Sequence, residues 1–180
     1  MHSSNYLEEL KLLHSKKTFG KGKTIPGYLK ELFKTQTINS MLDFGCGKGQ
    51  PFTGLNSDTF KVYNYDPVTS PIELPNAVDL VYSSDVLEHV ELDQLDSVLD
   101  NLFNIGQKYQ YHLIACHPAK KSLSDGRNAH LIIEQPSWWK QRLENNKWKI
   151  IHEDVLDYMA VVKKGPPIHC IKYIVCMEKV

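Results

Sequence analysis

The stretch MLDFGCGKG, residues 41–49, places an acidic residue just ahead of three closely spaced glycines. Glycines at alternate positions allow the backbone to turn sharply and to approach a bound ligand closely. Gln50 stands where a dinucleotide-binding turn that starts at Gly45 needs its third glycine, and no phosphate P-loop follows. Asp43, two residues before the first glycine, would repel a diphosphate and attract a positively charged group. The turn therefore predicts a ligand with a cationic group rather than a pyrophosphate.

A second acidic residue, Asp66, ends the apolar run VYNYDP and stands 23 residues after Asp43. In open α/β sheets, an acid at about this spacing commonly binds the two hydroxyls of a ribose. The expected ligand combines a cation with a ribose and has no phosphate. S-adenosylmethionine meets all three conditions.

Three motifs together resemble the class I S-adenosylmethionine-dependent methyltransferases. They are MLDFGCGKG, VYNYDP and VDLVYSSDVLEHV (residues 78–90), and they occur in that family's order and spacing within roughly residues 38–180. Within the family, the chain is most similar to small methyltransferase-like proteins of bacteria and phages. Those proteins carry segments similar to ACHPAKKSLSDGRNAH and PSWW. The resemblance implies S-adenosylmethionine as cofactor and S-adenosylhomocysteine as product.

The resemblance also implies where the cofactor would lie. The methionine part would follow the first strand and its turn, the ribose would contact the end of the second strand, and the fourth-strand motif would stand between cofactor and substrate. The residues assigned in this way are Asp43, Phe44, Gly45, Cys46, Gly47, Asp66, Pro67, Asp85 and Val86. Asp85 has an alternative role as the N-cap of the following turn, and the two roles are compatible.

The loop CHPAKKSLSDGRNAH is expected to form a lid or wall of the substrate pocket, because it follows a strand whose end should open on the ligand crevice. His117 is the candidate general base, with Asp85 and His130 as further catalytic candidates. Arg127 is expected to bind an anionic group of the substrate. The remaining substrate-binding candidates are Asn128 and Trp138. The alternatives are a solvated loop pinned by its own hydrogen bonds and a tryptophan that packs in the core.

No metal site is predicted from the sequence. Asp85, His117 and His130 could supply donor atoms, but no metal-ligand motif supports them. Glu88 and His89 look like an active-site pair, yet their place in the family signature favours a structural role in the turn after the strand.

The elements that must position these residues alternate between strands and helices. Helices are predicted within 3–17, 26–36, 91–106 and 136–146, and strands within 40–45, 61–67, 78–84, 109–116, 148–164 and 169–180. The last two strands suggest an antiparallel hairpin that closes an otherwise parallel sheet. The predicted fold is α/β, a Rossmann-like class I methyltransferase fold with a mostly parallel twisted sheet and an antiparallel C-terminal strand. Its third-strand region is reduced to residues 68–77.

Length and composition predict one domain with an N-terminal helical cap (1–37) and a Rossmann-like core (38–180). The chain has 180 residues, with 21 Lys and Arg against 21 Asp and Glu, so nothing marks it as a binder of long nucleic acids. Four cysteines without metal spacing, and no long apolar run, favour a reduced cytoplasmic protein with no membrane segment. The family's amino-methylating DNA and RNA enzymes often carry an Asn/Asp-Pro-Pro-Tyr/Phe motif after the fourth strand. This chain has SSDV there, which argues against those enzymes.

The expected activity is therefore O- or N-methylation of a small or medium-sized acceptor by a monomer or homodimer. Two alternatives remain open. One is a non-catalytic protein that binds S-adenosylmethionine or S-adenosylhomocysteine. The other is a small RNA-modifying methyltransferase that uses the basic segment 11–23.

Overall fold

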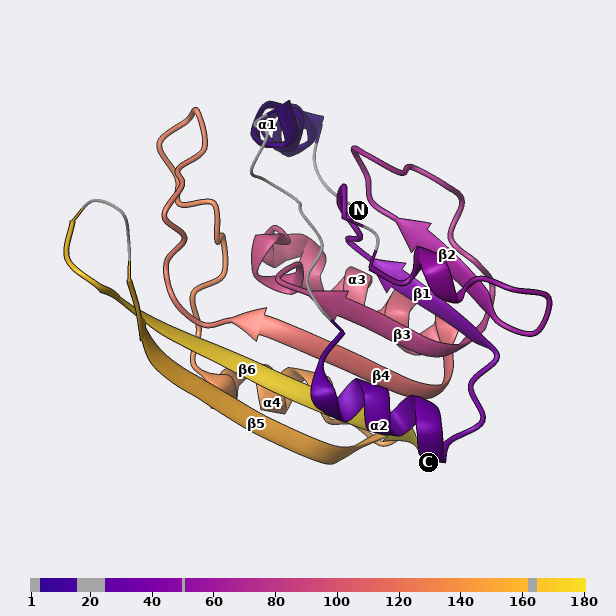
Figure 1. The fold of residues 1–180 in the computed structure, drawn as a ribbon. Coiled ribbons are helices and arrows are strands. Elements are labelled where there is room, and N and C mark those ends of the chain that lie inside the picture. Colours follow the sequence, from indigo (N-terminus) through magenta and orange to yellow (C-terminus); the bar gives the residue numbers. More distant parts are fainter. Residues whose placement is uncertain (1–3, 16–24, 50, 162–164) are drawn as a thin grey trace.

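A six-stranded sheet forms the centre of the molecule (Figure 1). The computed structural model describes residues 4–15, 25–49, 51–161 and 165–180, so Gln50 and residues 16–23 of the basic segment lie outside the described residues. The strands occur in the spatial order β2-β1-β3-β4-β6-β5. They are β1 (Ser40–Phe44), β2 (Lys61–Tyr65), β3 (Val78–Ser84), β4 (Gly106–Ala115), β5 (Trp148–Ala160) and β6 (Ile168–Lys179).

The sheet confirms the predicted mixture of directions. β2, β1, β3 and β4 pair in parallel, β6 pairs antiparallel to β4, and β5 pairs antiparallel to β6 as the outer strand of the hairpin. The reduced third-strand region is also confirmed, because residues 66–77, all described, contain no helix or strand between β2 and β3.

Helices cover both faces of the sheet, which is why β1 is buried along almost its whole length. Side chains of α3 (Leu92–Ile105) and α4 (Pro136–Leu143) pack with Leu42 and Val81 on one face. Side chains of α2 (Gly27–Thr35) pack with Met41 and Leu80 on the other. Figure 1 shows α2 on the near side of the sheet and α3 and α4 behind it.

The periodicity of α3 explains its place. The residues Leu95, Val98, Leu99, Leu102 and Ile105 recur at helical spacing and are all buried, so the helix turns one apolar stripe toward the sheet. Gly106 caps the helix and is also the first residue of β4. This double role is the reason that the strand begins three residues earlier than the sequence predicts.

The fold places the ends of β1, β3 and β4 along one edge, where a ligand is expected. From β1 the chain passes to β2 on one side, whereas β3 leads to β4 on the other side. The strand order therefore reverses between β1 and β3, and open α/β sheets bind ligands at such a point. Helix α1 (Ser4–Ser15) lies over this edge (Figure 1). Among the described residues, no helix is long and apolar enough to cross a membrane.

Candidate active site

The glycine turn leaves β1 in a conformation that other residues rarely adopt. Gly45 has φ +76° and Gly47 has φ +56°. The N–H groups of Gly45 and Cys46 both donate to the carbonyl oxygen of Tyr65, at 2.8 and 3.0 Å. A Cβ atom on Gly45 would lie only 2.4 Å from Cγ2 of Val86. The turn is thus tied to the end of β2 and packed against the segment after β3.

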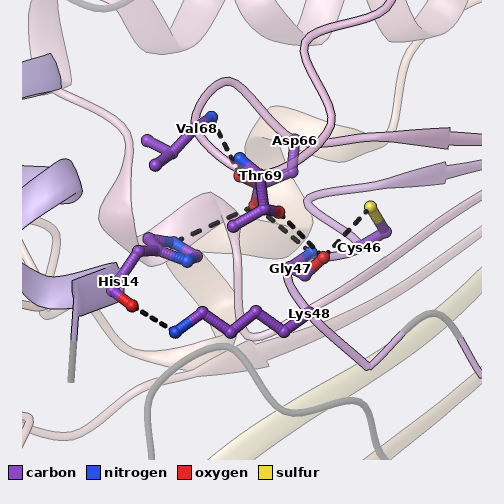
Figure 2. A network of polar contacts seen from close by, with 7 residues as sticks. All are labelled: His14, Cys46, Gly47, Lys48, Asp66, Val68 and Thr69. Atoms are coloured by element: carbon purple, nitrogen blue, oxygen red, sulfur yellow. Dashed lines mark hydrogen bonds and ion pairs between the residues drawn. The ribbon is translucent and has the colours of Figure 1, made fainter. Parts of the chain in front are cut away.

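Asp66 organises the backbone around the end of β2 (Figure 2). Its Oδ1 accepts the N–H groups of Val68 and Thr69 at 2.9 and 2.8 Å, and its Oδ2 accepts the N–H of Gly47 at 3.2 Å. The hydroxyl of Thr69 donates to the carbonyl oxygen of Gly47 at 2.8 Å. A carboxylate offers about four lone-pair positions, so Oδ2 retains capacity for one further donor.

Helix α1 reaches this network through its last turn. Nε2 of His14 lies 4.0 Å from Oδ2 of Asp66, and the ammonium group of Lys48 donates to the carbonyl oxygen of His14 (Figure 2). Burial lowers the pKa of His14, although Asp66 acts in the opposite direction. Earlier in the helix, Tyr6 and Leu10 pack with Leu123 of the loop after β4. Helix α1 therefore joins the glycine turn to that loop.

Asp43 is the buried acid beneath the turn, with 2% of its surface exposed. Burial, and secondly the carboxylate of Asp66, raise the pKa of Asp43 to about 7. Its Oδ2 has no hydrogen-bond partner among the described residues. Burying a carboxylate costs free energy unless a hydrogen-bond donor or a cation accompanies it, so this oxygen is suited to a cationic ligand.

The other predicted cofactor residues surround the turn. Phe44 is buried in β1 and stacks on Tyr65, with ring centroids 5.3 Å apart. Cys46 is buried in the turn, and Pro67 is half-buried directly after Asp66. Val86 packs against both Gly45 and the main core. The structure brings the whole predicted cofactor set to the ends of β1, β2 and β3.

A pocket of about 480 Å³ opens beside the ends of β3 and β4. This volume is typical of small-molecule sites. The segments that line it are the turn after β3, the loop after β4 and the tip of the β5–β6 hairpin. Its polar or ionisable side chains are Asp85, His89, His117, Lys120, Lys121, His130, Tyr158, Cys170 and Lys172. The three predicted catalytic residues, Asp85, His117 and His130, therefore line one pocket.

The three histidines of the pocket are held in the same way. Nδ1 of His89 bonds the carbonyl oxygen of Ala129 at 2.6 Å, Nδ1 of His117 bonds that of Ile171 at 2.8 Å, and Nδ1 of His130 bonds that of His117 at 2.5 Å. A carbonyl oxygen can only accept, so Nδ1 carries the proton in each ring. In the neutral ring, Nε2 is then the nitrogen that carries the lone pair.

Asp85 joins the pocket to the hairpin. It is the one non-glycine residue with positive φ, +53°, in the described part of the chain, a conformation that aspartate tolerates better than most residues. Its Oδ1 accepts from Nζ of Lys172 at 2.6 Å, and both side chains are largely buried. This ion pair fixes the carboxylate at the mouth of the pocket.

The predicted substrate-binding residues lie in the loop and in α4 rather than in the pocket lining. Arg127 is exposed and pairs with Asp125, its guanidinium NH2 lying 2.7 Å from Oδ2. Asn128 bonds both backbone groups of Ala119 and accepts the N–H of His130. Trp138 is half-buried in α4 under the guanidinium of Arg142, at 4.3 Å. The structure thus brings His130 into the pocket and leaves Arg127 and Trp138 outside its lining.

Sequence reasoning missed the contribution of the hairpin and of α1. Lys172 lies opposite Ala115 in the antiparallel register of β4 and β6, so its place follows from strand pairing over a long sequence separation. The sequence shows His14 only as part of a helical pattern and gives no sign that it lies beside Asp66. His89, interpreted from the sequence as structural, lines the pocket.

No protein-family model matches the chain, and no curated protein matches it. Solved structures do match. One, from work on the conversion of a disulfide bond into a thioacetal group during echinomycin biosynthesis, has TM-score 0.61 and 14% identity over 96% of this chain and 92% of that one. An S-adenosylmethionine-dependent methyltransferase from Methanosarcina mazei has TM-score 0.56 and 11% identity, over 88% and 99%.

A third match is the 1,6-didemethyltoxoflavin-N1-methyltransferase of Burkholderia thailandensis, solved with bound 1,6-didemethyltoxoflavin and S-adenosylhomocysteine. It has TM-score 0.54 and 12% identity, over 98% of this chain and 78% of that one. Identities this low establish architecture and not activity. The chain has the Rossmann-like fold of the class I S-adenosylmethionine-dependent methyltransferases.

Proposed function

We propose that the protein is an S-adenosylmethionine-dependent methyltransferase that acts on a small or medium-sized acceptor. The observation that carries the proposal is the buried carboxylate of Asp43, whose Oδ2 has no hydrogen-bond partner among the described residues, directly below the glycine turn. A ligand with a cationic methionine part would supply the missing positive charge.

The chain's own residues fit this cofactor at both ends. The positive-φ turn at Gly45 and Gly47 brings backbone rather than side chains to the ligand. Asp66 keeps a lone-pair position on Oδ2 for a ribose hydroxyl while its other contacts hold the turn. Asp85 and Val86 lie between the turn and the pocket, where the methyl group would point toward the acceptor.

In the transfer itself, a lone pair of the acceptor attacks the sulfonium methyl carbon and the C–S bond breaks. The electron pair of that bond stays on sulfur, so the leaving group is the neutral thioether S-adenosylhomocysteine. The protein's contribution is to orient the two reactants and to exclude water. An acceptor that arrives protonated must lose its proton, and His117, with Nε2 available in its neutral ring, is the proposed base.

The pocket favours an acceptor with an anionic group. Lys120, Lys121 and Lys172 line it, and Lys172 already pairs with Asp85. A carboxylate or phosphate on the acceptor would lie near the ammonium groups of Lys120 and Lys121, which line the same pocket. The pocket volume accommodates a metabolite-sized molecule.

Calorimetric titration with S-adenosylmethionine and S-adenosylhomocysteine tests the cofactor. We expect saturable binding by the wild type and at least about 10-fold weaker binding by Asp66→Asn, which retains an oxygen acceptor but loses the charge. Asp96→Asn, at an exposed carboxylate of α3, is the matched control and should bind like the wild type. Absence of binding by folded wild-type protein would refute the proposal.

Turnover with a panel of anionic metabolites then separates an enzyme from a non-catalytic binder. Cofactor binding without methyl transfer to any of them would favour the binding protein. Methyl transfer abolished in His117→Ala, with cofactor affinity unchanged, would support the assigned base.

A further inference from the structure

Beside the pocket, the structure gathers one carboxylate and two imidazoles from two separate segments. The potential ligand atoms of Glu88, His89 and His130 all lie within 4.8 Å of one another. Glu88 and His89 belong to the turn Leu87–His89 (η2), and His130 comes from the loop after β4. We propose that these three residues bind a divalent transition-metal cation, which in turn holds an oxygen nucleophile of the acceptor.

The backbone fixes the two segments against each other. The N–H of Ile132 donates to the carbonyl oxygen of Glu88 at 3.0 Å, and Nδ1–H of His89 donates to that of Ala129 at 2.6 Å. Asn128 accepts the N–H of His130 at 2.9 Å and bonds Ala119 across the loop. The donor set is therefore preorganised rather than assembled by chance from mobile side chains.

The imidazoles present the tautomer that a metal requires. Nδ1 of His89 and Nδ1 of His130 both donate to backbone carbonyl oxygens, so Nε2 is the nitrogen through which each neutral ring would bind a metal. A backbone carbonyl that holds the second ring nitrogen is the usual outer partner of a metal-binding histidine. In the same way, Oε1 of Glu88 accepts the N–H of Ala115 at 3.2 Å, which orients the carboxylate.

Charge favours the same conclusion. Glu88 is fully buried, and its carboxylate adds a negatively charged ligand to the two neutral imidazoles. Metal bonds of about 2.1 Å put two ligands at most roughly 4.2 Å apart, so small side-chain rotations bring the three donors onto one ion. One carboxylate and two imidazoles suit Mn²⁺, Fe²⁺, Co²⁺ or Zn²⁺.

The site would leave coordination positions open on the pocket side. His89 and His130 line the pocket, whereas Glu88 is fully buried and is not among the lining residues. Three protein ligands are too few to fill a four- to six-coordinate ion, so an acceptor hydroxyl can bind there. The metal would lower the pKa of that hydroxyl, His117 or water would take the proton, and the oxygen would attack the methyl group. This part deepens the proposed function and depends on it.

The set differs from the one suggested by the sequence. Of Asp85, His117 and His130, only His130 belongs to the cluster. Asp85 is paired with Lys172, and His117 stands next to His130 with ring centroids 5.6 Å apart. His117 therefore keeps its proposed role as base beside the metal.

The test is a titration of chelator-treated, folded protein with Co²⁺, followed by visible absorption, with Zn²⁺ as competitor. We expect one equivalent to bind the wild type with spectral bands of nitrogen and oxygen ligation. His89→Gln, His130→Gln and Glu88→Gln should each bind at least about 100-fold more weakly. His169→Ala, at an exposed histidine of the hairpin, is the control and should match the wild type.

Two outcomes would overturn the site: no saturable Co²⁺ binding by folded wild type, or equal binding by wild type and all three variants. Circular dichroism identifies any variant that does not fold, and the remaining variants then carry the test. Water-proton relaxation with bound Mn²⁺ counts exchangeable waters. A bound Mn²⁺ without exchangeable water would have no open coordination position, and this result would refute the proposal that the metal holds the acceptor.

Titration of the same variants with S-adenosylhomocysteine separates the two proposals. We expect its affinity to stay within about 2-fold of wild type, because Asp43 and Asp66 are intact. If S-adenosylhomocysteine binds and Co²⁺ does not, the metal site fails alone. If Co²⁺ binds and S-adenosylhomocysteine does not, the proposed function fails and the metal site stands.

Discussion

The glycine turn and the histidine pocket lie at the same edge of the sheet but are built differently. The turn joins residues 45–47 to residues 65–69, and backbone N–H groups make most of its contacts. The pocket joins three segments far apart in sequence, at residues 85–89, 115–130 and 158–172, and its side chains make the decisive contacts. A site made from backbone depends on conformation, and a site made from side chains depends on which residues are present.

Substitution of the turn glycine should have the largest effect. Gly45→Ala combines unfavourable positive φ with a Cβ placed 2.4 Å from Val86, so we expect a loss of about 3 kcal/mol in the free energy of unfolding. Cofactor binding should be lost as well. Urea denaturation and calorimetry measure the two effects.

Gly126→Ala in the loop after β4 is the matched control. Gly126 has φ +89°, but no atom lies within 4 Å of the added Cβ. Only the backbone strain remains, worth about 1 kcal/mol. If both substitutions lowered the free energy of unfolding equally, the contact of the added Cβ with Val86 would have no effect. The turn would then not be packed tightly against the segment after β3.

The buried acid of the turn gives a prediction of intermediate size. The folded-state pKa of Asp43, about 7, lies above its ordinary value of 3.8, so the folded protein binds the extra proton between these values. Stability is therefore lost as the pH rises from about 4 to above 7. Asp43→Asn should match the wild type at pH 4 and exceed its free energy of unfolding by about 2 kcal/mol at pH 8.

Cofactor affinity should change in the opposite sense. A cationic ligand favours ionised Asp43, so wild-type affinity should rise about 10-fold between pH 6 and 8, while that of Asp43→Asn stays flat. His112, whose pKa burial lowers to about 3, adds its own pH dependence to stability, but the comparison of the two proteins cancels it. If the free energies of unfolding of the wild type and Asp43→Asn changed with pH in the same way, Asp43 would not be the buried ionisable group that the prediction requires.

The difference between the two regions also explains what the sequence could predict. The turn at Gly45 and the acids at Asp43 and Asp66 form a local pattern whose spacing has a direct physical reason, so their place at the ends of β1 and β2 could be predicted before any coordinates. Their role in binding a cofactor stays a prediction. The strands and helices followed from apolar periodicity in the same way. His117 and His130 lie in one loop, and their ring centroids are 5.6 Å apart in the structure.

The remainder of the pocket depends on tertiary pairing. Lys172 reaches Asp85 only because β6 runs antiparallel to β4, and His89 meets His130 only because residues 129–132 bond to the turn after β3. The sequence also does not show that Arg127 pairs with Asp125, two residues away in the same loop. The predicted contact of Arg127 with the substrate stays a prediction. The division of the chain into a cap (1–37) and a core (38–180) stays a prediction.

The smallest predicted effect comes from a substitution that should make the loop of the pocket more mobile while the glycine turn stays intact. Asn128 makes three hydrogen bonds that hold the loop, one of them to the N–H of His130. Asn128→Ala should cost about 1 kcal/mol in the free energy of unfolding. Hydrogen exchange of residues 117–131 should accelerate, with S-adenosylhomocysteine affinity unchanged.

Asp125→Ala is the control for that measurement, since its exposed carboxylate bonds the backbone N–H and the guanidinium of Arg127 in the same loop. It removes a surface ion pair, so we expect stability to change by less than about 0.5 kcal/mol and exchange near His130 to stay slow. If Asn128→Ala weakened S-adenosylhomocysteine binding as well as accelerating hydrogen exchange in the loop, the turn and the pocket would be one cooperative unit. The coupling would then run through α1, which packs its buried Tyr6 and Leu10 against the loop and places His14 beside Asp66. In that case Tyr6→Ala, which removes a fully buried side chain from the α1 contact, should reproduce both effects.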